Sequence, residues 1–263
     1  MPRFRLAVHK FSSCDGCQLA LLNLGDALLE LAELVDIVHF AEAGPVNEDA
    51  PVDLALVEGS VSTAHDVERI RRIRDSARVL VAIGACATAG GLQSLRNRAD
   101  GAAWLSGIYD APQHIDFVAQ VAPVSAHVKV DLELWGCPVN KQQVLAALKD
   151  VMLGVAPRRP TASLCLECKR LGRVCTLVTG SDVCMGPVTR AGCGALCQGR
   201  GRGCYACFGP AEGVNTEALG RRLHAGGLTT DDVARRFHFI NANAPAFAAA
   251  GDAWRRRDGG DGT

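Results

Sequence analysis

The sequence has little that would suit it to nucleic acid or to a charged membrane. Only 5% of its 263 residues are aromatic, and its formal net charge is zero. Base stacking needs exposed aromatic rings, and phosphate groups attract an excess of Lys and Arg. We therefore expect no nucleic-acid partner and no attraction to an anionic lipid surface.

Long hydrophobic runs are also missing. The most apolar long stretch, residues 19–38, is interrupted by Asp26, Glu30 and Glu33, whereas a spanning helix needs about 20 mostly apolar residues. The opening MPRFRLAVHKFSSC is too short and polar for a signal peptide and lacks a twin-arginine pair. These features predict a cytoplasmic protein with no membrane segment.

Cysteine, in contrast, is abundant, with twelve residues in the chain. The cytoplasm keeps thiols reduced, so these cysteines are better explained as metal ligands than as disulfides. Twelve thiols make three sets of four, and four is the number that a 4Fe–4S cluster requires.

Residues 1–155 alternate between strand-like and helix-like runs, which predicts an α/β domain with an open, mostly parallel sheet covered on both faces. The strands are expected at 5–11, 35–40, 52–59, 78–86 and 128–137. The helices are expected at 19–34, 66–77 and 139–152.

Four cysteines lie where these strands end. Cys14 and Cys17 are in the loop after the first strand, Cys86 ends the fourth and Cys137 ends the fifth. Because sites form at the carboxyl ends of parallel strands, we expect the four thiols to meet at one sheet edge. The CxxC pair alone would also fit a redox dithiol, and buried structural cysteines are common, but a dithiol leaves Cys86 and Cys137 unexplained.

Two glycines and one carboxylate are expected at the same edge. Gly84 and Gly136 would let the backbone approach a bulky cluster closely. Glu58, at the end of the third strand, is a candidate for proton handling or cluster tuning, and a helix-capping role fits it nearly as well.

Residues 156–263 form a second region, which begins with the linker 156–160. It is irregular and rich in cysteine and glycine, and so short a segment needs metal sites to supply its core. The local split gives two quartets: Cys165, Cys168, Cys175 and Cys184, then Cys193, Cys197, Cys204 and Cys207. Zinc also takes four thiolates, and the two quartets could exchange a ligand as in ferredoxins; spacing leaves both alternatives open.

The rest of this region is polar or weakly helical. A helix is expected at 229–237, with a Thr/Asp N-cap pattern, and residues 250–263 are expected to be frayed. The seven histidines show no pairing at metal-ligand spacing, so each is interpreted as structural or exposed: His9, His39, His65, His114, His127, His224 and His238.

Five segments together resemble the small subunit of cytosolic nickel–iron hydrogenases, and most of all the delta subunit of the NADP-linked bidirectional enzymes, the sulfhydrogenases. They are SSCDGCQLALL (12–22), VEGSVST (57–63), AIGACATAGG (82–91), WGCPVN (135–140) and CMGPVTRAGCGALCQGRGRGCYACFGP (184–210). The resemblance covers the chain to about residue 240.

This resemblance implies a flavodoxin-like N-terminal domain and three 4Fe–4S clusters. Cys14, Cys17, Cys86 and Cys137 match the proximal ligands, the first C-terminal quartet the distal ligands and the second the medial ligands. The implied role is an electron relay with no catalytic residue of its own. The implied partners are a nickel–iron large subunit, a flavin/NAD(P) reductase subunit and a further iron–sulfur subunit, in an obligate hetero-oligomer.

Three positions depart from the family pattern. Gln18 replaces a common Glu, which puts a proton route there in doubt. Cys165 replaces a His of respiratory members, and Cys197 adds a fourth medial cysteine, which favours 4Fe–4S and a lower potential.

Other functions remain open at this point. One is a related hydrogenase serving a deazaflavin or heterodisulfide partner. A quinone-reducing complex subunit shares the proximal fold but would lack the eight C-terminal cysteines. A different class is an interaction protein with zinc-stapled loops.

Overall fold

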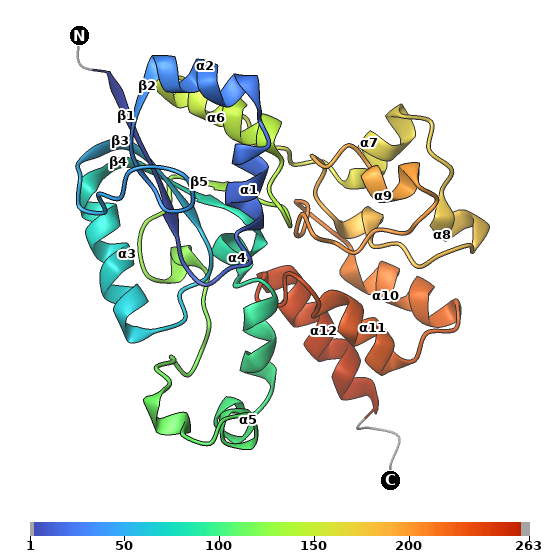
Figure 1. The fold of residues 1–263 in the computed structure, drawn as a ribbon. Helices are drawn as coiled ribbons and strands as arrows, with labels where there is room; N and C mark the ends of the chain where they lie inside the picture. The colour runs from blue at the N-terminus through green and yellow to red at the C-terminus, as the bar shows by residue number, and fades with distance from the viewer. Residues whose placement is uncertain (1–2, 259–263) are drawn as a thin grey trace. The chain divides into compact units, whose positions relative to one another are not determined.

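A computed structural model describes residues 3–258 of the chain. The chain divides into two compact units, the first ending at Arg158 and the second beginning at Arg159 (Figure 1).

Unit 1 is built on one sheet of five parallel strands in the order β2-β1-β3-β4-β5. The strands are β1 (Phe4–Lys10), β2 (Val35–Phe40), β3 (Val52–Glu58), β4 (Ala77–Ile83) and β5 (Leu132–Leu134). This is the doubly wound order of flavodoxin-like folds, so the predicted α/β class is confirmed.

The strands are buried on both faces, which is why they read as continuous apolar runs. Side chains at alternate positions, such as Leu6 and Val8, face a core shared with α1, α2 and α6. The intervening Ala7 faces a second core, which includes Ile70 and Ile73 of α3. Figure 1 shows α2 and α6 on one side of the sheet and α3 on the other.

The helices of unit 1 follow the prediction in part. They are α1 (Gly16–Leu22), α2 (Asp26–Leu34), α3 (Ala64–Ser76), α4 (Gly84–Ala89), α5 (Gly101–Ile108) and α6 (Lys141–Met152), with short 3₁₀ turns η1 (Leu92–Arg98), η2 (Pro112–His114) and η3 (Val124–Ala126). The single helix expected at 19–34 is wrong. Gly25, at φ +62°, breaks it into α1 and α2, because a left-handed residue cannot continue a right-handed helix.

Two strands are shorter than predicted, and this corrects the positions of two cysteines. β4 stops at Ile83, so Cys86 lies in α4 rather than at a strand end. β5 covers only three residues, so Cys137 lies in the loop beyond it. Residues 84–131 form the connection between these strands, and its helices were not predicted.

Unit 2 has short helices around the cysteines, followed by a helical end. The helices are α7 (Leu164–Arg170), α8 (Thr176–Thr179), α9 (Leu196–Gly199), α10 (Thr216–Ala225), α11 (Thr230–Phe237) and α12 (Pro245–Asp258), with the 3₁₀ turn η4 (Gly186–Val188). The predicted helix at 229–237 is confirmed, and the Thr229 hydroxyl accepts the Asp232 N–H as its cap.

The expectation of a frayed end is wrong for residues 250–258. They belong to α12, where the Trp254 side chain is buried. Residues 259–263 lie outside the described part of the chain. None of the helices between residues 3 and 258 combines the length and apolarity that crossing a bilayer demands.

Two of the seven histidines form a buried pair. The rings of His9 on β1 and His39 on β2 stack with centroids 4.5 Å apart. Burial, the neighbouring His39 and Arg69 together lower the pKa of His9 from 6.5 to about 3. Burial also lowers the pKa of His39, against the attraction of Glu48. Both imidazoles are therefore neutral in the folded protein at physiological pH.

This pair predicts an acid-sensitive fold. Unfolded His9 takes up a proton below pH 6.5 while folded His9 does not, so stability is lost as pH falls through that range. The loss of unfolding free energy between pH 8 and pH 5 should be about 2 kcal/mol smaller in His9→Phe than in the wild type. Urea unfolding at both pH values measures it. The exposed His114→Gln should keep the wild-type loss, and an unchanged His9→Phe profile would contradict the prediction.

Candidate functional site: three groups of cysteines

The first cysteine group lies at the topological switch point of the sheet. β1 pairs with β2 on one side and with β3 on the other, so the chain leaves β1 at the crevice where the order reverses. Lys10 and Glu58 end β1 and β3 side by side. The loop after Lys10 carries Cys14 and Cys17, which places both at this crevice.

Glu58 fastens this loop to β3. Its two carboxylate oxygens accept the backbone N–H groups of Cys17 at 2.9 Å and Gln18 at 3.2 Å. These groups lie in the first turn of α1, where N–H groups have no partner within the helix, and Asp15 at the N-cap offers no side-chain bond. Glu58 therefore caps α1 from the neighbouring strand, one of the two roles predicted for it.

The carboxylate of Glu58 is deeply buried, with 2% of its surface exposed. Burial raises its pKa, and the hydrogen bonds from the Cys17 and Gln18 backbone oppose that rise. The Gln18 side chain is also fully buried, and neither its amide oxygen nor its nitrogen has a hydrogen-bond partner in the described part of the chain. Its amide still lies close enough to favour the charged form of Glu58.

The structure brings the four N-terminal cysteines into one neighbourhood. Cys86 and Cys137 lie close enough to Cys17 to raise its pKa through charge repulsion, and Cys14 does the same to Cys137. The backbone N–H of Val139 lies 3.4 Å from the Cys17 sulfur, although the two residues are 122 positions apart. The expected meeting at one sheet edge is thus observed, with Cys86 contributed by α4 and Cys137 by a loop.

Two glycines make room for these sulfurs. A Cβ atom on Gly84 would lie 2.3 Å from the Cys17 sulfur, and one on Gly91 would lie 2.5 Å from the Cys86 sulfur. Both residues have positive φ, +84° and +61°, which side chains rarely adopt. The backbone therefore packs against the thiols at distances that only glycine permits. The expected approach of Gly84 and Gly136 to a cluster stays a prediction.

Free thiolates are disfavoured in this group. Burial is the main reason that the pKa values of Cys17, Cys86 and Cys137 are raised, that of Cys86 to about 11, and the nearby cysteines and Glu58 add to it. A bound cationic centre would offset both effects, because thiolates are its ligands. The donor set fits an iron–sulfur cluster.

The first C-terminal quartet, Cys165, Cys168, Cys175 and Cys184, lines one largely enclosed cavity with Gly186 and Gln198. One turn of α7 separates Cys165 from Cys168, which puts both on the same face. Cys168 and Cys184 are buried, whereas Cys175 reaches the surface. The four thiols thus surround a cavity with one exposed edge.

The structure places the second C-terminal quartet as two pairs of cysteines, each with backbone N–H groups beside its sulfurs. The N–H of Ala206 donates to the Cys204 sulfur at 3.2 Å. Burial raises the pKa of Cys193, and hydrogen bonds from the N–H groups of Leu196 and Ala195 oppose that rise. Cys193 lies near Cys197, and Cys204 near Cys207. Ala195 and Ala206 both have positive φ, a turn geometry that directs successive N–H groups toward one point.

The two C-terminal quartets touch at Cys184. Its sulfur accepts the N–H of Cys204 at 3.3 Å and the side-chain amide of Gln198 at 3.5 Å. Cys184 belongs to the first quartet and Cys204 to the second, so a direct hydrogen bond joins the groups.

Several polar residues around the sulfurs were not predicted. Gln93 lies 3.5 Å from the Cys86 sulfur while its amide nitrogen donates to the Ser12 carbonyl. Thr189 lies 3.5 Å from the Cys204 sulfur. Asp182 accepts the N–H groups of Val183 and Gly203, both at 2.7 Å. Common polar residues in loops carry no spacing pattern, so a single sequence offers no sign of these contacts.

Among the described residues, 3–258, no three His, Cys, Asp or Glu side chains are arranged to hold a single metal ion.

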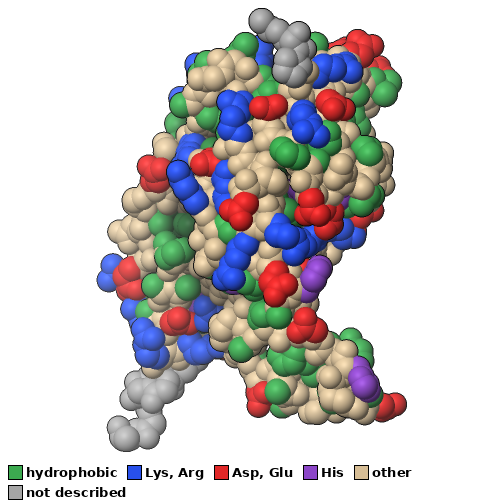
Figure 2. Space-filling model, turned by 90° about the vertical axis from the view of Figure 1, so that its left-hand side faces the viewer, with side chains coloured by type: hydrophobic (Ala, Val, Ile, Leu, Met, Phe, Trp, Pro, Cys, Tyr) green, Lys and Arg blue, Asp and Glu red, His purple; other side chains and the backbone are tan. Residues whose placement is uncertain are grey.

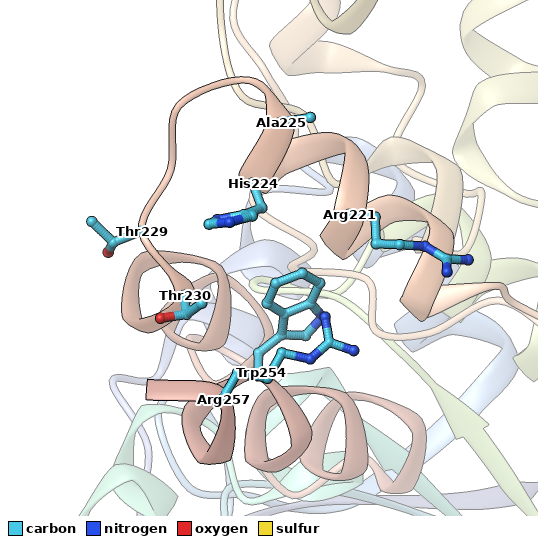
Figure 3. A pocket seen from close by; sticks show the side chains of 7 residues that line it. All are labelled: Arg221, His224, Ala225, Thr229, Thr230, Trp254 and Arg257. Atoms are coloured by element: carbon cyan, nitrogen blue, oxygen red, sulfur yellow. The ribbon is translucent and has the colours of Figure 1, made fainter. Parts of the chain in front are cut away.

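A separate hollow in unit 2 lies between α10, α11 and α12, and none of the described residues that line it is a cysteine (Figure 3). There the Arg257 guanidinium stacks 3.9 Å above the Trp254 ring, and Glu217 binds Arg257 at 2.9 Å.

Comparison with known proteins points to one group. Residues 14–151 match the family model described as NADH ubiquinone oxidoreductase, 20 Kd subunit. The sulfhydrogenase 2 subunit delta of Pyrococcus furiosus is 36% identical over 82% of this chain and 90% of its own length. One subunit of the F420-non-reducing hydrogenase vhu of Methanocaldococcus jannaschii is 30% identical over 79% of this chain and 82% of its own length.

A solved structure agrees with these relatives. A chain of an NAD+-reducing [NiFe]-hydrogenase in the H2-reduced state is 31% identical, with a TM-score of 0.55. The match covers 60% of this chain and 96% of the solved one.

The Glu58 cap predicts a stability effect. Glu58→Ala leaves two buried N–H groups without acceptors and should lower the unfolding free energy by about 2 kcal/mol or more. Glu58→Gln keeps one acceptor oxygen and should lower the unfolding free energy by less than Glu58→Ala does. Urea unfolding of the anaerobic chain measures both variants, with the exposed Glu30→Ala as the control. Values for both Glu58 variants within about 0.5 kcal/mol of wild type would show that the cap is dispensable.

Proposed function

We propose that this chain relays electrons through three 4Fe–4S clusters. It belongs to the hydrogenase small-subunit branch of the NADH ubiquinone oxidoreductase 20 kDa subunit family. It is therefore an iron–sulfur electron-transfer subunit of a hydrogenase. The relay would run between a nickel–iron site in the large subunit and a flavin/NAD(P) reductase subunit, with a further iron–sulfur subunit in the same assembly. This chain itself supplies no catalytic residue.

One observation carries the proposal: Cys14, Cys17, Cys86 and Cys137 meet at the switch point of the sheet although they span more than 120 residues. A redox dithiol would need only Cys14 and Cys17. We assign these four cysteines to the proximal cluster. We assign the first C-terminal quartet to the distal cluster and the second to the medial cluster.

A bound 4Fe–4S cluster supplies one-electron transfer, and the surrounding residues set the conditions for it. The backbone N–H groups of Val139, Cys204 and Ala206 point at cysteine sulfurs, and such hydrogen bonds stabilise added negative charge. Glu58 fixes the turn that carries Cys17. The Cys204–Cys184 hydrogen bond supports a short path between the medial and distal groups.

The surface beside the distal quartet supports electron transfer from these cysteines to a partner subunit. Cys175 is exposed, and Val174 and Val178 next to it are 70% and 78% exposed. Lys169 and Arg173 favour the charged forms of Cys165 and Cys168. An apolar surface with basic residues around a redox group suits a subunit interface.

A second acceptor is favoured by one specific observation. The Methanocaldococcus jannaschii relative is named as part of an F420-non-reducing hydrogenase, a name that mentions neither NAD nor NADP. The alternative is a hydrogenase linked to a deazaflavin or heterodisulfide partner. Hydrogen oxidation by the purified complex, assayed separately with NAD, NADP and a heterodisulfide, distinguishes the two. Reduction of NAD or NADP supports the proposal, and turnover with the heterodisulfide alone supports the alternative.

Metal analysis tests the three clusters directly. The anaerobically purified chain should contain about twelve irons and twelve sulfides, no nickel, and a brown absorption band at about 400 nm. Four irons with two zincs would retain the proximal cluster and make the C-terminal quartets structural zinc sites. A colourless chain containing only zinc would contradict the relay altogether.

The close packing of Gly84 against the Cys17 sulfur allows a test of whether Cys17 holds the proximal cluster. In Gly84→Ala the new Cβ would collide with the Cys17 sulfur, so iron should fall from about twelve to about eight per chain. Gly25→Ala is a matched control, because Gly25 also has positive φ but has open space around it. Iron and sulfide analysis of both variants measures the effect. An equal iron content in the two would contradict the assignment of Cys17.

A further inference from the structure

Helix α5 exposes its apolar side chains. The fractions exposed are 57% for Trp104, 70% for Ile108 and 50% for the following Tyr109, and none of the eight helix residues, all of them described, is buried. Helices this short are marginal without tertiary packing. A tryptophan and an isoleucine held out on such a helix indicate a surface that a partner covers.

The base of this segment is anchored, so the exposure is not that of a loose loop. Asn97 in η1 and Val121 exchange two hydrogen bonds, at 2.7 and 2.8 Å. The Arg96 guanidinium donates to the carbonyl of Val118 at 3.1 Å and lies over the Phe117 ring. The Arg96 guanidinium also donates to the Ser62 carbonyl at 3.3 Å, and the Val118 N–H donates to the same carbonyl at 2.9 Å. The segments on both sides of α5 are therefore hydrogen-bonded to the body of unit 1.

The charge of this segment has one sign. Residues 99–128 contain no Lys and no Arg, but they contain Asp100, Asp110 and Asp116. Figure 2 shows the corresponding lobe, at the lower right, with hydrophobic and acidic side chains on the face in view. An acidic surface is repelled by anionic lipid and by nucleic acid, so a protein with basic groups fits it best.

We propose that residues 99–121 form a docking arm for a partner subunit that presents an apolar groove bordered by Lys or Arg. Trp104, Ile108 and Tyr109 would fill the groove, because aromatic and large apolar side chains dominate binding energy at interfaces. Asp110 and Asp116 would face the basic border and set the orientation. This inference rests on the proposed function, since it requires a multi-subunit hydrogenase, but it does not involve the cysteines.

The test is amide hydrogen exchange in the full chain, alone and in the complex formed with its co-produced hydrogenase subunits. The amides of residues 101–109 should exchange about tenfold more slowly, or slower still, in the complex, because an interface removes local opening. Trp104→Ala with Ile108→Ala should weaken binding of one subunit about 30-fold or more. Asp110→Lys with Asp116→Lys should also weaken binding of that subunit, and the loss should be larger at low salt than at high salt.

The matched control is Val46→Ala, which removes an equally exposed aliphatic side chain, 72% exposed, from another loop. It should leave binding unchanged. The inference is overturned if α5 gains no protection in the complex, or if its protection appears in the chain alone and rises with self-association in sedimentation. Iron content separates the two proposals: docking variants that keep wild-type iron but bind normally overturn only the arm, whereas a wild-type chain without iron overturns the relay.

Discussion

The pair of hydrogen bonds from the start of α1 to Glu58 is the contact on which the first cysteine group, Cys14, Cys17, Cys86 and Cys137, depends. The chain leaves β1 at the switch point and must turn immediately into a helix whose first N–H groups lack partners. A buried carboxylate on the neighbouring strand accepts two of them at once and thereby attaches the turn that carries Cys17 to β3. Cys86 on α4 and Cys137 in the loop after β5 approach the same point, so a shift of Cys17 would change its distance to both.

The same carboxylate creates an electrostatic conflict that the rest of the site must balance. Glu58 adds negative charge beside thiols that are already buried and close to one another. Burial is the largest cause of the raised pKa values of Glu58, Cys17 and Cys137, and the charge of Glu58 adds to the rise for the two thiols. The backbone N–H of Val139 opposes this rise for Cys17. The N–H of Ala206 likewise opposes the burial-raised pKa of Cys204 in the second unit. In the C-terminal unit, Lys169 and Arg173 act in the same direction from outside the quartet.

The sequence predicts the sheet well because its strands are buried on both faces and therefore read as unbroken apolar runs. It predicts the strand ends less well. Cys86 was expected to end β4, but the small residues after Ile83 continue as helix α4, and apolar pattern alone does not distinguish the two. The region 84–131 was harder still, because α5 buries nothing and so carries no periodic apolar face.

For the cysteines, spacing indicated which thiols could meet, and the structure brings Cys14, Cys17, Cys86 and Cys137 together as expected. The supporting groups were out of reach. Gln93, Thr189 and Gln198 act through side-chain placement set by the tertiary fold, and nothing in their sequence neighbourhood marks them. The stacked His9 and His39 were similarly invisible, since they lie 30 residues apart and meet only because β1 and β2 are neighbours.

The break at Gly25 has a consequence for how such a chain can diverge. It separates α1, which carries Cys17 and is capped by Glu58, from α2, where no residue is fully buried. Substitutions along α2 can change the outer surface of unit 1 without moving Cys17, because the turn at Gly25 interrupts the helix and α1 has its own attachment to Glu58. Related chains could therefore acquire different neighbours at α2 while the group of four N-terminal cysteines stayed the same.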